Sequence, residues 1–179
     1  MPTMPVVRVE FSTSVGTLVV PLDAMVNVAF PDIVRAFSMP IPMIQWVVIA
    51  YTLTYASLML VFGRLGDMFG HRRIYLVGAA VSAIAFVGCA AAPGFGWLLA
   101  GRVAQGIGAA LLLSCGPALA TFLFPEAQRA RALGLYTMFF GLGGALGPPV
   151  AGVLVQLWGW QAVYAVRAPL CLLAFGCAL

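Results

Sequence analysis

The sequence predicts an all-α membrane protein, a bundle of six transmembrane helices, from three observations. Of its 179 residues, 63% are hydrophobic and only 8% are charged, whereas a soluble domain carries about 25% charged residues. The mean hydropathy is +1.07. The apolar residues fall into runs near the ~20 residues that a helix needs to cross a bilayer, which is too long for barrel strands of about 9–11 residues.

Six such runs follow one another with short connections. Their ranges are 11–30, 43–62, 74–92, 97–122, 132–157 and 160–179. Arg8 before the first run could mark a secretory signal, but the length of that run and the polar residues inside it favour a membrane span. The last run is still apolar at Leu179, so we expect the chain to be truncated within the sixth helix.

Arginines in the connections predict the orientation of the bundle. Six of them flank the same side of the expected membrane, namely Arg8, Arg64, Arg72, Arg73, Arg129 and Arg131. The opposite side carries only Arg35. Because basic residues accumulate in cytoplasmic connections, we expect a multi-pass protein of the cell inner (plasma) membrane with a cytoplasmic N-terminus.

Composition also limits the partners and the chemistry. The net charge of +4 comes from arginines scattered between apolar runs, not from a basic face that would bind nucleic acid. The four cysteines lie inside apolar stretches and are interpreted as packing residues rather than disulfides or metal ligands. No nucleophile, base and orienting group occur at matched spacing. We therefore expect membrane lipid as the surroundings, and no enzyme activity, metal or cofactor.

The segment 63–73, GRLGDMFGHRR, lies between the second and third expected helices. Its glycines permit tight turns and close approach of helices, and Asp67 can cap a helix and pair with nearby arginines. The string resembles the signature loop of the major facilitator superfamily, although Met68 and His71 stand where basic residues are usual. A plain turn rich in positive charge is the alternative. The resemblance implies a cytoplasmic gating loop formed by Gly63, Asp67, Gly70, Arg72 and Arg73.

The first expected helix contains PLDAMVNVAFPDI. Asp23 and Asn27 are four residues apart and share a helical face, and Pro21 should bend the helix. An ionisable residue at membrane depth is costly and suggests a function, although a carboxyl group kept there for packing is the alternative. The string resembles that of the fourteen-helix drug:proton antiporter branch, which implies that Asp23 and Asn27 lie on the proton or substrate pathway.

The fourth expected helix opens with LLAGRVAQGIGA. Arg102, Gln105, Gly106 and Ala109 fall on one face at helical spacing. The string resembles the family pattern RxxQGxGA, which implies that Arg102 and Gln105 take part in proton transfer. The alternative is an arginine that extends to the outer membrane interface.

The fifth expected helix contains GLGGALGPPVAG. Small residues recur every four positions on two faces, so that neighbouring helices can approach closely, and the two prolines should break the hydrogen-bond ladder and kink the helix. The string resembles the pattern GxxxGPxxGG, which is associated with antiporters. A generic close-packing helix is the alternative. The implied antiporter-type residues are Gly143, Gly147, Pro148 and Gly152.

Two further features carry less information. Tyr51 and Tyr55 could line a cavity for aromatic solutes, whereas Trp46 is equally an interface anchor. The string WGWQAVYAVRAP resembles the pattern WRWxFxxNxP, with Gln161 in place of the arginine and Arg167 in place of the asparagine. Arg167 either extends to the interface or pairs with Asp23, and we favour the first.

The resemblance covers about residues 22–169 and implies the N-terminal half of a major facilitator fold, with two inverted three-helix repeats in one domain over 1–179. The implied function is secondary transport, as proton-coupled export of small hydrophobic or cationic compounds of the multidrug efflux type. Its implied partner is a second six-helix bundle. The alternative is a non-transporting membrane fragment, or a subunit that needs a partner bundle.

Overall fold

The computed structural model describes residues 16, 18–122 and 125–178, which are helical with short connections. Arg8, the beginning of the first expected span and Leu179 lie outside these residues. The long helices are α4 (Gln45–Phe69), α5 (His71–Ala90), α6 (Phe95–Phe122) and α7 (Glu126–Trp158). Shorter elements precede and follow them: η1 (Pro21–Asp23), α2 (Ala24–Val28), α3 (Phe30–Ala36), η2 (Ile41–Ile44), α8 (Gln161–Ala165) and α9 (Arg167–Ala178).

Four helical segments of the described residues are long and apolar enough to cross a membrane, and they correspond to the second to fifth expected spans. They are Ile41–Phe69, His71–Ala90, Phe95–Leu119 and Glu126–Trp158, with Gln161–Cys177 as a shorter apolar helix. The described part of the first expected span is not one long helix but is divided into η1, α2 and the beginning of α3. Pro21 and Pro31 stand at the first turns of η1 and α3, where a missing backbone N–H is tolerated. The bend expected at Pro21 is thus a short 3₁₀ turn.

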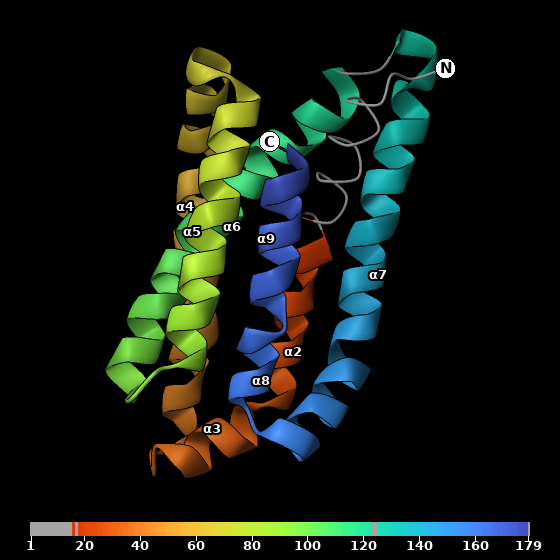
Figure 1. The fold of residues 1–179 in the computed structure, drawn as a ribbon. Helices are drawn as coiled ribbons and strands as arrows, with labels where there is room; N and C mark the ends of the chain where they lie inside the picture. Colours follow the sequence, from red (N-terminus) through yellow and green to blue (C-terminus); the bar gives the residue numbers. More distant parts are fainter. Residues whose placement is uncertain (1–15, 17, 123–124, 179) are drawn as a thin grey trace.

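Successive helices run in alternate directions, so that their connections lie at two opposite ends (Figure 1). The end of α4, the beginning of α5 and the beginning of α7 lie at one end, and these segments contain Arg64, Arg72, Arg73, Arg129 and Arg131. The other end holds α3, with Arg35, and α8. Among the described residues, the fold therefore separates the connecting arginines into the two groups expected from the sequence.

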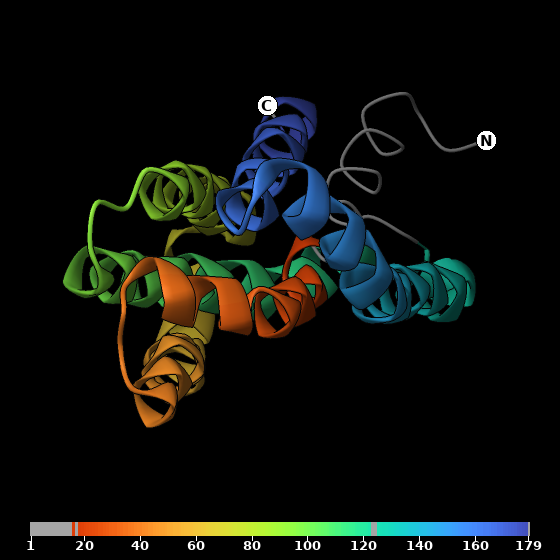
Figure 2. The same cartoon turned by 90° about the horizontal axis from the view of Figure 1, so that it is seen from below.

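The closest packing is between α6 and its neighbours α4 and α5. A Cβ atom on Gly78 of α5 would lie 2.7 Å from the Cβ of Leu111 in α6, and one on Gly106 of α6 would lie 2.8 Å from the carbonyl oxygen of Tyr51 in α4. Small residues permit such approach where no hydrophobic effect drives helices together. Viewed along the bundle, α4, α5 and α6 form one group, while α7 stands on the other side of η1 and α2 (Figure 2).

The helix ends differ from the expected ones at the second span. α4 continues to Phe69 instead of ending near residue 62, because Gly63 and Gly66 are compatible with a helix and only Gly70, at φ 92°, makes the turn. A positive φ costs glycine little. The segment 63–73 is therefore mostly helix rather than loop.

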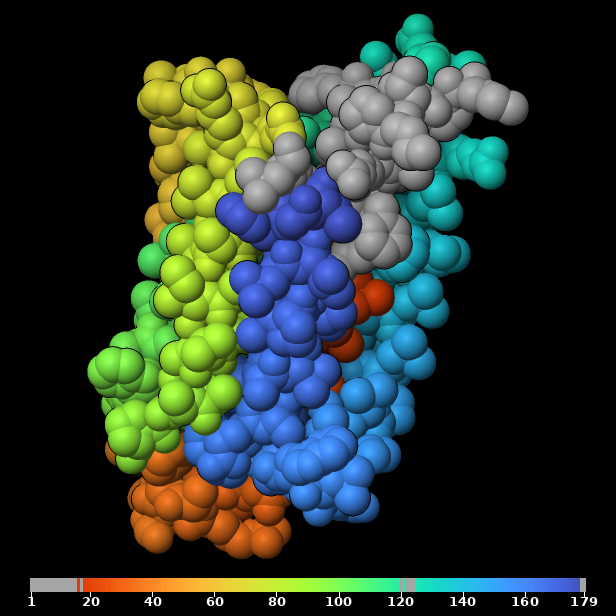
Figure 3. Space-filling model, viewed as in Figure 1, coloured from red at the N-terminus to blue at the C-terminus, as the bar shows by residue number. Residues whose placement is uncertain are grey.

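α9 lies between α5 and α7 on the face shown in Figure 3, and it packs against α5. By contrast, α4 and α7 are mostly uncovered, since only 11% and 22% of their most apolar windows are buried. Their exposed side chains include Leu53, Leu60, Leu146 and Val153. Such a large apolar surface requires lipid or another helical bundle to cover it.

Candidate functional site: a buried carboxylate between two arginines

The centre of the bundle holds an ion pair between Asp23, the last residue of η1, and Arg102 of α6. Nη1 of Arg102 donates to Oδ1 of Asp23 at 2.6 Å, and Nη2 donates to Oδ2 at 2.7 Å. This is a bidentate pair, in which the planar guanidinium matches the carboxylate. The structure thus brings together the two ionisable residues that the sequence placed inside the first and fourth helices.

Further contacts fix the position of Arg102. Its Nε donates to the carbonyl oxygen of Val47 in α4 at 2.9 Å, and its Nη1 also donates to Oε1 of Gln105 at 2.6 Å. The guanidinium carbon lies 4.4 Å from the ring centroid of Tyr51, within the range of a cation–π contact. Arg102 is 0% exposed, so the alternative of an arginine that extends to the membrane interface is wrong.

Arg167, at the beginning of α9, is a second partner of Asp23. Its Nη1 donates to Oδ1 of Asp23 at 3.0 Å, and its Nε donates to the carbonyl oxygen of Val163 at 3.1 Å. The side chain is 1% exposed. Our preference for an interfacial Arg167 is therefore wrong, because the side chain is buried and binds Asp23.

A small cavity adjoins the cluster. Its volume is about 10 Å³, and its lining includes Asp23, Tyr51, Ser82, Gln105 and Arg167. Among the described residues, three buried polar atoms have no hydrogen-bond partner: Nε2 of Gln105, Nη2 of Arg167 and the hydroxyl of Tyr164. A cavity of roughly 10–15 Å³ has room for one water molecule.

Asp23 is the most exposed member of this cluster. Its side chain is 17% exposed, while those of Arg102 and Arg167 are 0% and 1% exposed. Chemically, the arrangement is a titratable acid between two permanent cations.

The other residues expected near this site differ in their placement. Gln105 joins the cluster, but Asn27 is exposed and lies outside it. Tyr51 supports Arg102, and Tyr55 packs on Tyr51 with ring centroids 5.2 Å apart. At Tyr51, where the sequence suggested the wall of an aromatic cavity, the ring packs against Arg102.

Within the segment 63–73, Asp67 lies beside His71, with 3.3 Å between Oδ1 and Nε2, and the side chain of Asp67 is 73% exposed. No side-chain bond caps α5, so the expected capping by Asp67 is not observed. Arg72 and Arg73 lie in the first turn of α5.

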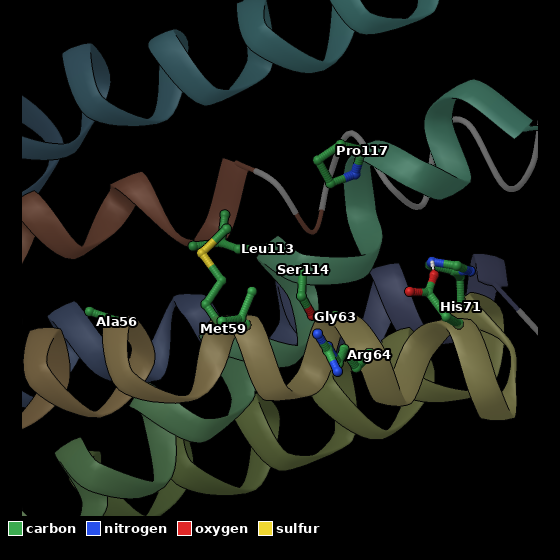
Figure 4. Close-up of a pocket in the computed structure, with 10 residues that line it drawn as sticks. Ala56, Met59, Gly63, Arg64, His71, Leu113, Ser114 and Pro117 are labelled. Atoms are coloured by element: carbon green, nitrogen blue, oxygen red, sulfur yellow. Dashed lines mark ion pairs between the residues drawn. The ribbon is translucent and has the colours of Figure 1, made fainter.

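An open groove of about 650 Å³ runs beside this segment (Figure 4). Figure 4 shows Met59 and Leu113 at one part of the groove and Arg64 and His71 towards the other. The groove lies between α4 and α6, with Asp67 and Ser114 also in its wall. It thus combines an apolar part with a polar part.

The glycine-rich face of α7 contacts the segment that carries Asp23. A Cβ atom on Gly143 would lie 2.5 Å from the carbonyl oxygen of Leu18, and one on Gly147 would lie 3.4 Å from Cγ of Met25. The second small face makes a looser contact: a Cβ atom on Gly144 would lie 3.9 Å from Cβ of Pro21, whereas Gly152 has open space around it and Pro148 is exposed. α7 continues as one helix through Pro148 and Pro149, so the two prolines do not end it.

Within the described residues, no group of three or more His, Cys, Asp and Glu side chains is placed to hold a metal ion. The described cysteines are free, and Cys89, Cys115 and Cys171 are buried, as expected for packing residues. Sequence reasoning named the pairing of Arg167 with Asp23 as one possibility but preferred the other. The signal available in the sequence was a count of charges inside the expected spans. There are two arginines but one carboxylate, so the second arginine has no carboxylate of its own to pair with.

The model of the Major Facilitator Superfamily matches residues 13–179. The chain belongs to this superfamily. The superfamily consists of membrane transporters of small molecules rather than enzymes, and the chain is accordingly a multi-pass membrane protein. The likeness of its motifs to those of drug exporters is supported by the relatives with which it can be aligned.

Several relatives are named for resistance to antibiotics or other drugs. The chain is 38% identical to the multidrug resistance protein Stp of Mycobacterium tuberculosis, over 89% of this chain and 30% of that one. It is 43% identical to a methylenomycin A resistance protein of Bacillus subtilis, over 88% and 34%, and 40% identical to the puromycin resistance protein pur8 of Streptomyces alboniger, over 90% and 33%. The chain thus spans about a third of the length of these relatives.

The major facilitator fold also appears in solved structures. A bacterial homologue of the human lysosomal transporter Spinster, crystallised in an inward-facing and unoccupied conformation, superposes with a TM-score of 0.83 at 23% identity. The match covers 99% of this chain and 43% of the other. The helical arrangement is therefore that of one part of a major facilitator transporter.

Proposed function

We propose that the chain forms the first six-helix bundle, over 1–179, of a transporter in the cell inner membrane, with a cytoplasmic N-terminus and a second six-helix bundle as its partner. The complete transporter exports small hydrophobic or cationic compounds in exchange for protons. The resistance proteins among the relatives support the substrate class. Rocking of one bundle against another is the usual mode of transport in such folds.

The observation that carries the proposal is the bidentate pair of Asp23 with Arg102, in which the acid is the more exposed partner. Burial favours the neutral acid, whereas a neighbouring guanidinium favours the carboxylate. A movement that changes the separation of the two groups therefore changes the tendency of Asp23 to hold a proton. Such dependence is what coupling to a proton gradient requires.

The glycine face of α7 provides a link from Asp23 to such a movement. Gly143 and Gly147 touch the segment from Leu18 to Met25, which includes the acid. A displacement of α7 therefore displaces η1, while Arg102 stays bonded to Val47 in α4. These contacts support a role for Gly143 and Gly147 in coupling.

The test is proton-driven transport with the full chain as its gene encodes it. Inside-out vesicles are given an imposed pH gradient, and uptake of puromycin and of ethidium, a hydrophobic cation, is followed. Asp23→Asn keeps the size and hydrogen bonding of the side chain but cannot ionise, so we expect it to abolish uptake driven by the gradient. Asp32→Asn is the matched control, because Asp32 forms a surface pair with Arg35 at 3.6 Å. Normal gradient-driven uptake by Asp23→Asn would rule out the proposed role of Asp23.

A further inference from the structure

We infer that Arg167 is a positioning residue for proton coupling: as a second counter-cation of Asp23, it sets the pH range over which this acid accepts a proton. The inference rests on the proposed function, in which Asp23 is the proton acceptor. It concerns a residue that the sequence placed at the membrane interface, and at which the family pattern has an asparagine.

The geometry of Arg167 fits a tuning role better than a packing role. Its guanidinium carbon lies 4.7 Å from the ring centroid of Phe86 and 5.4 Å from that of Tyr164, and its Nε is held by the carbonyl oxygen of Val163. These contacts direct the charge to Oδ1 of Asp23, the same oxygen that Arg102 binds. Two guanidinium groups thus share one carboxylate oxygen.

The two arginines are not equivalent. Every nitrogen of the Arg102 guanidinium has a hydrogen-bond partner, whereas Nη2 of Arg167 has none among the described residues. An arginine kept only for structure is expected to satisfy its buried donors. Arg102 therefore anchors the carboxylate, and Arg167 adds charge with a less complete set of bonds.

The charges around the acid do not balance. Arg102 from α6 and Arg167 from α9 face Asp23, and the other titratable side chains near it among the described residues are Tyr51 from α4, Cys89 from α5 and Tyr164 from α8. From α7, this segment is approached by Gly143, Gly144 and Gly147, which carry no charge. The ionised cluster therefore has one surplus positive charge, and protonation of Asp23 raises the surplus to two.

The direction of the effect follows from this count. Each nearby positive charge stabilises the carboxylate over the neutral acid. Removal of the Arg167 charge leaves Asp23 with Arg102 alone, so the acid should accept a proton at higher pH. Since one close opposite charge shifts such an equilibrium by roughly 1–3 pH units, we expect the midpoint of protonation to rise by about one unit or more.

The experiment measures protonation directly. Infrared difference spectra of the purified full chain follow the C=O band of the protonated carboxyl group against pH, and Asp23→Asn identifies the band. Arg167→Gln and Arg167→Met remove the charge, while Arg167→Lys is the matched control that keeps it. We expect both neutral variants to raise the midpoint, and Arg167→Lys to restore it towards that of the unaltered protein. The pH dependence of transport should shift in the same direction.

Three results would overturn the inference. One is an unchanged midpoint in a folded neutral variant, and another is an equal shift in the lysine variant, which would indicate a change of shape rather than charge. The third is the failure of both neutral variants to fold while Arg167→Lys folds, which would make Arg167 a structural ion. Because the spectra require no transport, normal transport by Asp23→Asn would refute the proposed function and leave the measured midpoints intact.

Discussion

Asp23 accepts two hydrogen bonds from Arg102, at 2.6 and 2.7 Å, although 79 residues separate them in the sequence. The pair joins the first and fourth helices, and Arg102 also bonds to Val47 in α4. One side chain thus connects three segments. Loss of the Arg102 side chain leaves the Asp23 carboxylate, the carbonyl oxygen of Val47 and the amide oxygen of Gln105 without their main donor.

We therefore predict that Arg102→Ala destabilises the fold by about 3–5 kcal/mol, the usual cost of removing one partner of a buried pair. Arg35→Ala is the control, because Arg35 is 77% exposed and its bond to Asp32 spans 3.6 Å. A surface pair of this kind contributes at most about 1 kcal/mol. Thermal unfolding in detergent measures both, and equal stability of the two variants would contradict the prediction.

A second prediction concerns the glycine face of α7. Gly143→Ala should destabilise the protein by about 1–3 kcal/mol, because the new Cβ meets the carbonyl oxygen of Leu18. Gly147→Ala should be tolerated, since its Cβ would lie 3.4 Å from Met25, but Gly147→Leu should not. Gly152→Ala, with nothing within 4 Å, is the control and should be neutral. A neutral Gly143→Ala would mean that this face is not a tight contact.

A third prediction concerns orientation, which rests on the arginine count. Met68 lies in the last turn of α4 and is 74% exposed. In a background without cysteines, Met68→Cys should resist a membrane-impermeant thiol reagent in intact cells and react in inside-out vesicles. Efficient labelling of intact cells would invert the proposed topology.

A fourth prediction separates the two interpretations of Tyr51. If its ring supports Arg102, at 4.4 Å, Tyr51→Phe should leave the unfolding temperature unchanged. Tyr51→Leu should then cost about 0.5–2 kcal/mol, the contribution of a cation–π contact. An unchanged stability of Tyr51→Leu together with altered substrate preference would instead favour the aromatic cavity expected from the sequence.

The positions of the long helices could be predicted from the sequence, because the cost of burying backbone and charge in lipid leaves few alternatives. Hydropathy thus located α5 and α6 to within a few residues. The end of α4 was misplaced, since glycine permits both a turn and a helix and only its neighbours decide between them. Gly63 and Gly66 took the helix, and Gly70 made the turn.

The candidate site was predictable in part for a related reason. A buried Asp23 requires a cation, and Arg102 was one of two arginines inside other expected spans. The direction of a side chain, however, depends on helix rotation, which short breaks alter. Asp23 ends a 3₁₀ turn while Asn27 belongs to α2, so they do not share one continuous α-helical face. The inward direction of Arg167 depended in the same way on the rotation of its helix, which places the side chain at Asp23.

The surplus positive charge of the Asp23 cluster makes it sensitive to voltage. Moving one elementary charge across a membrane potential of 100 mV changes the free energy by about 2.3 kcal/mol. The cluster has two cations and one acid, so its charge is never zero in either protonation state. For a transporter in which the whole cluster changes its depth in the membrane, the electrical potential would act on this charge even without bound substrate, and more strongly once Asp23 holds a proton.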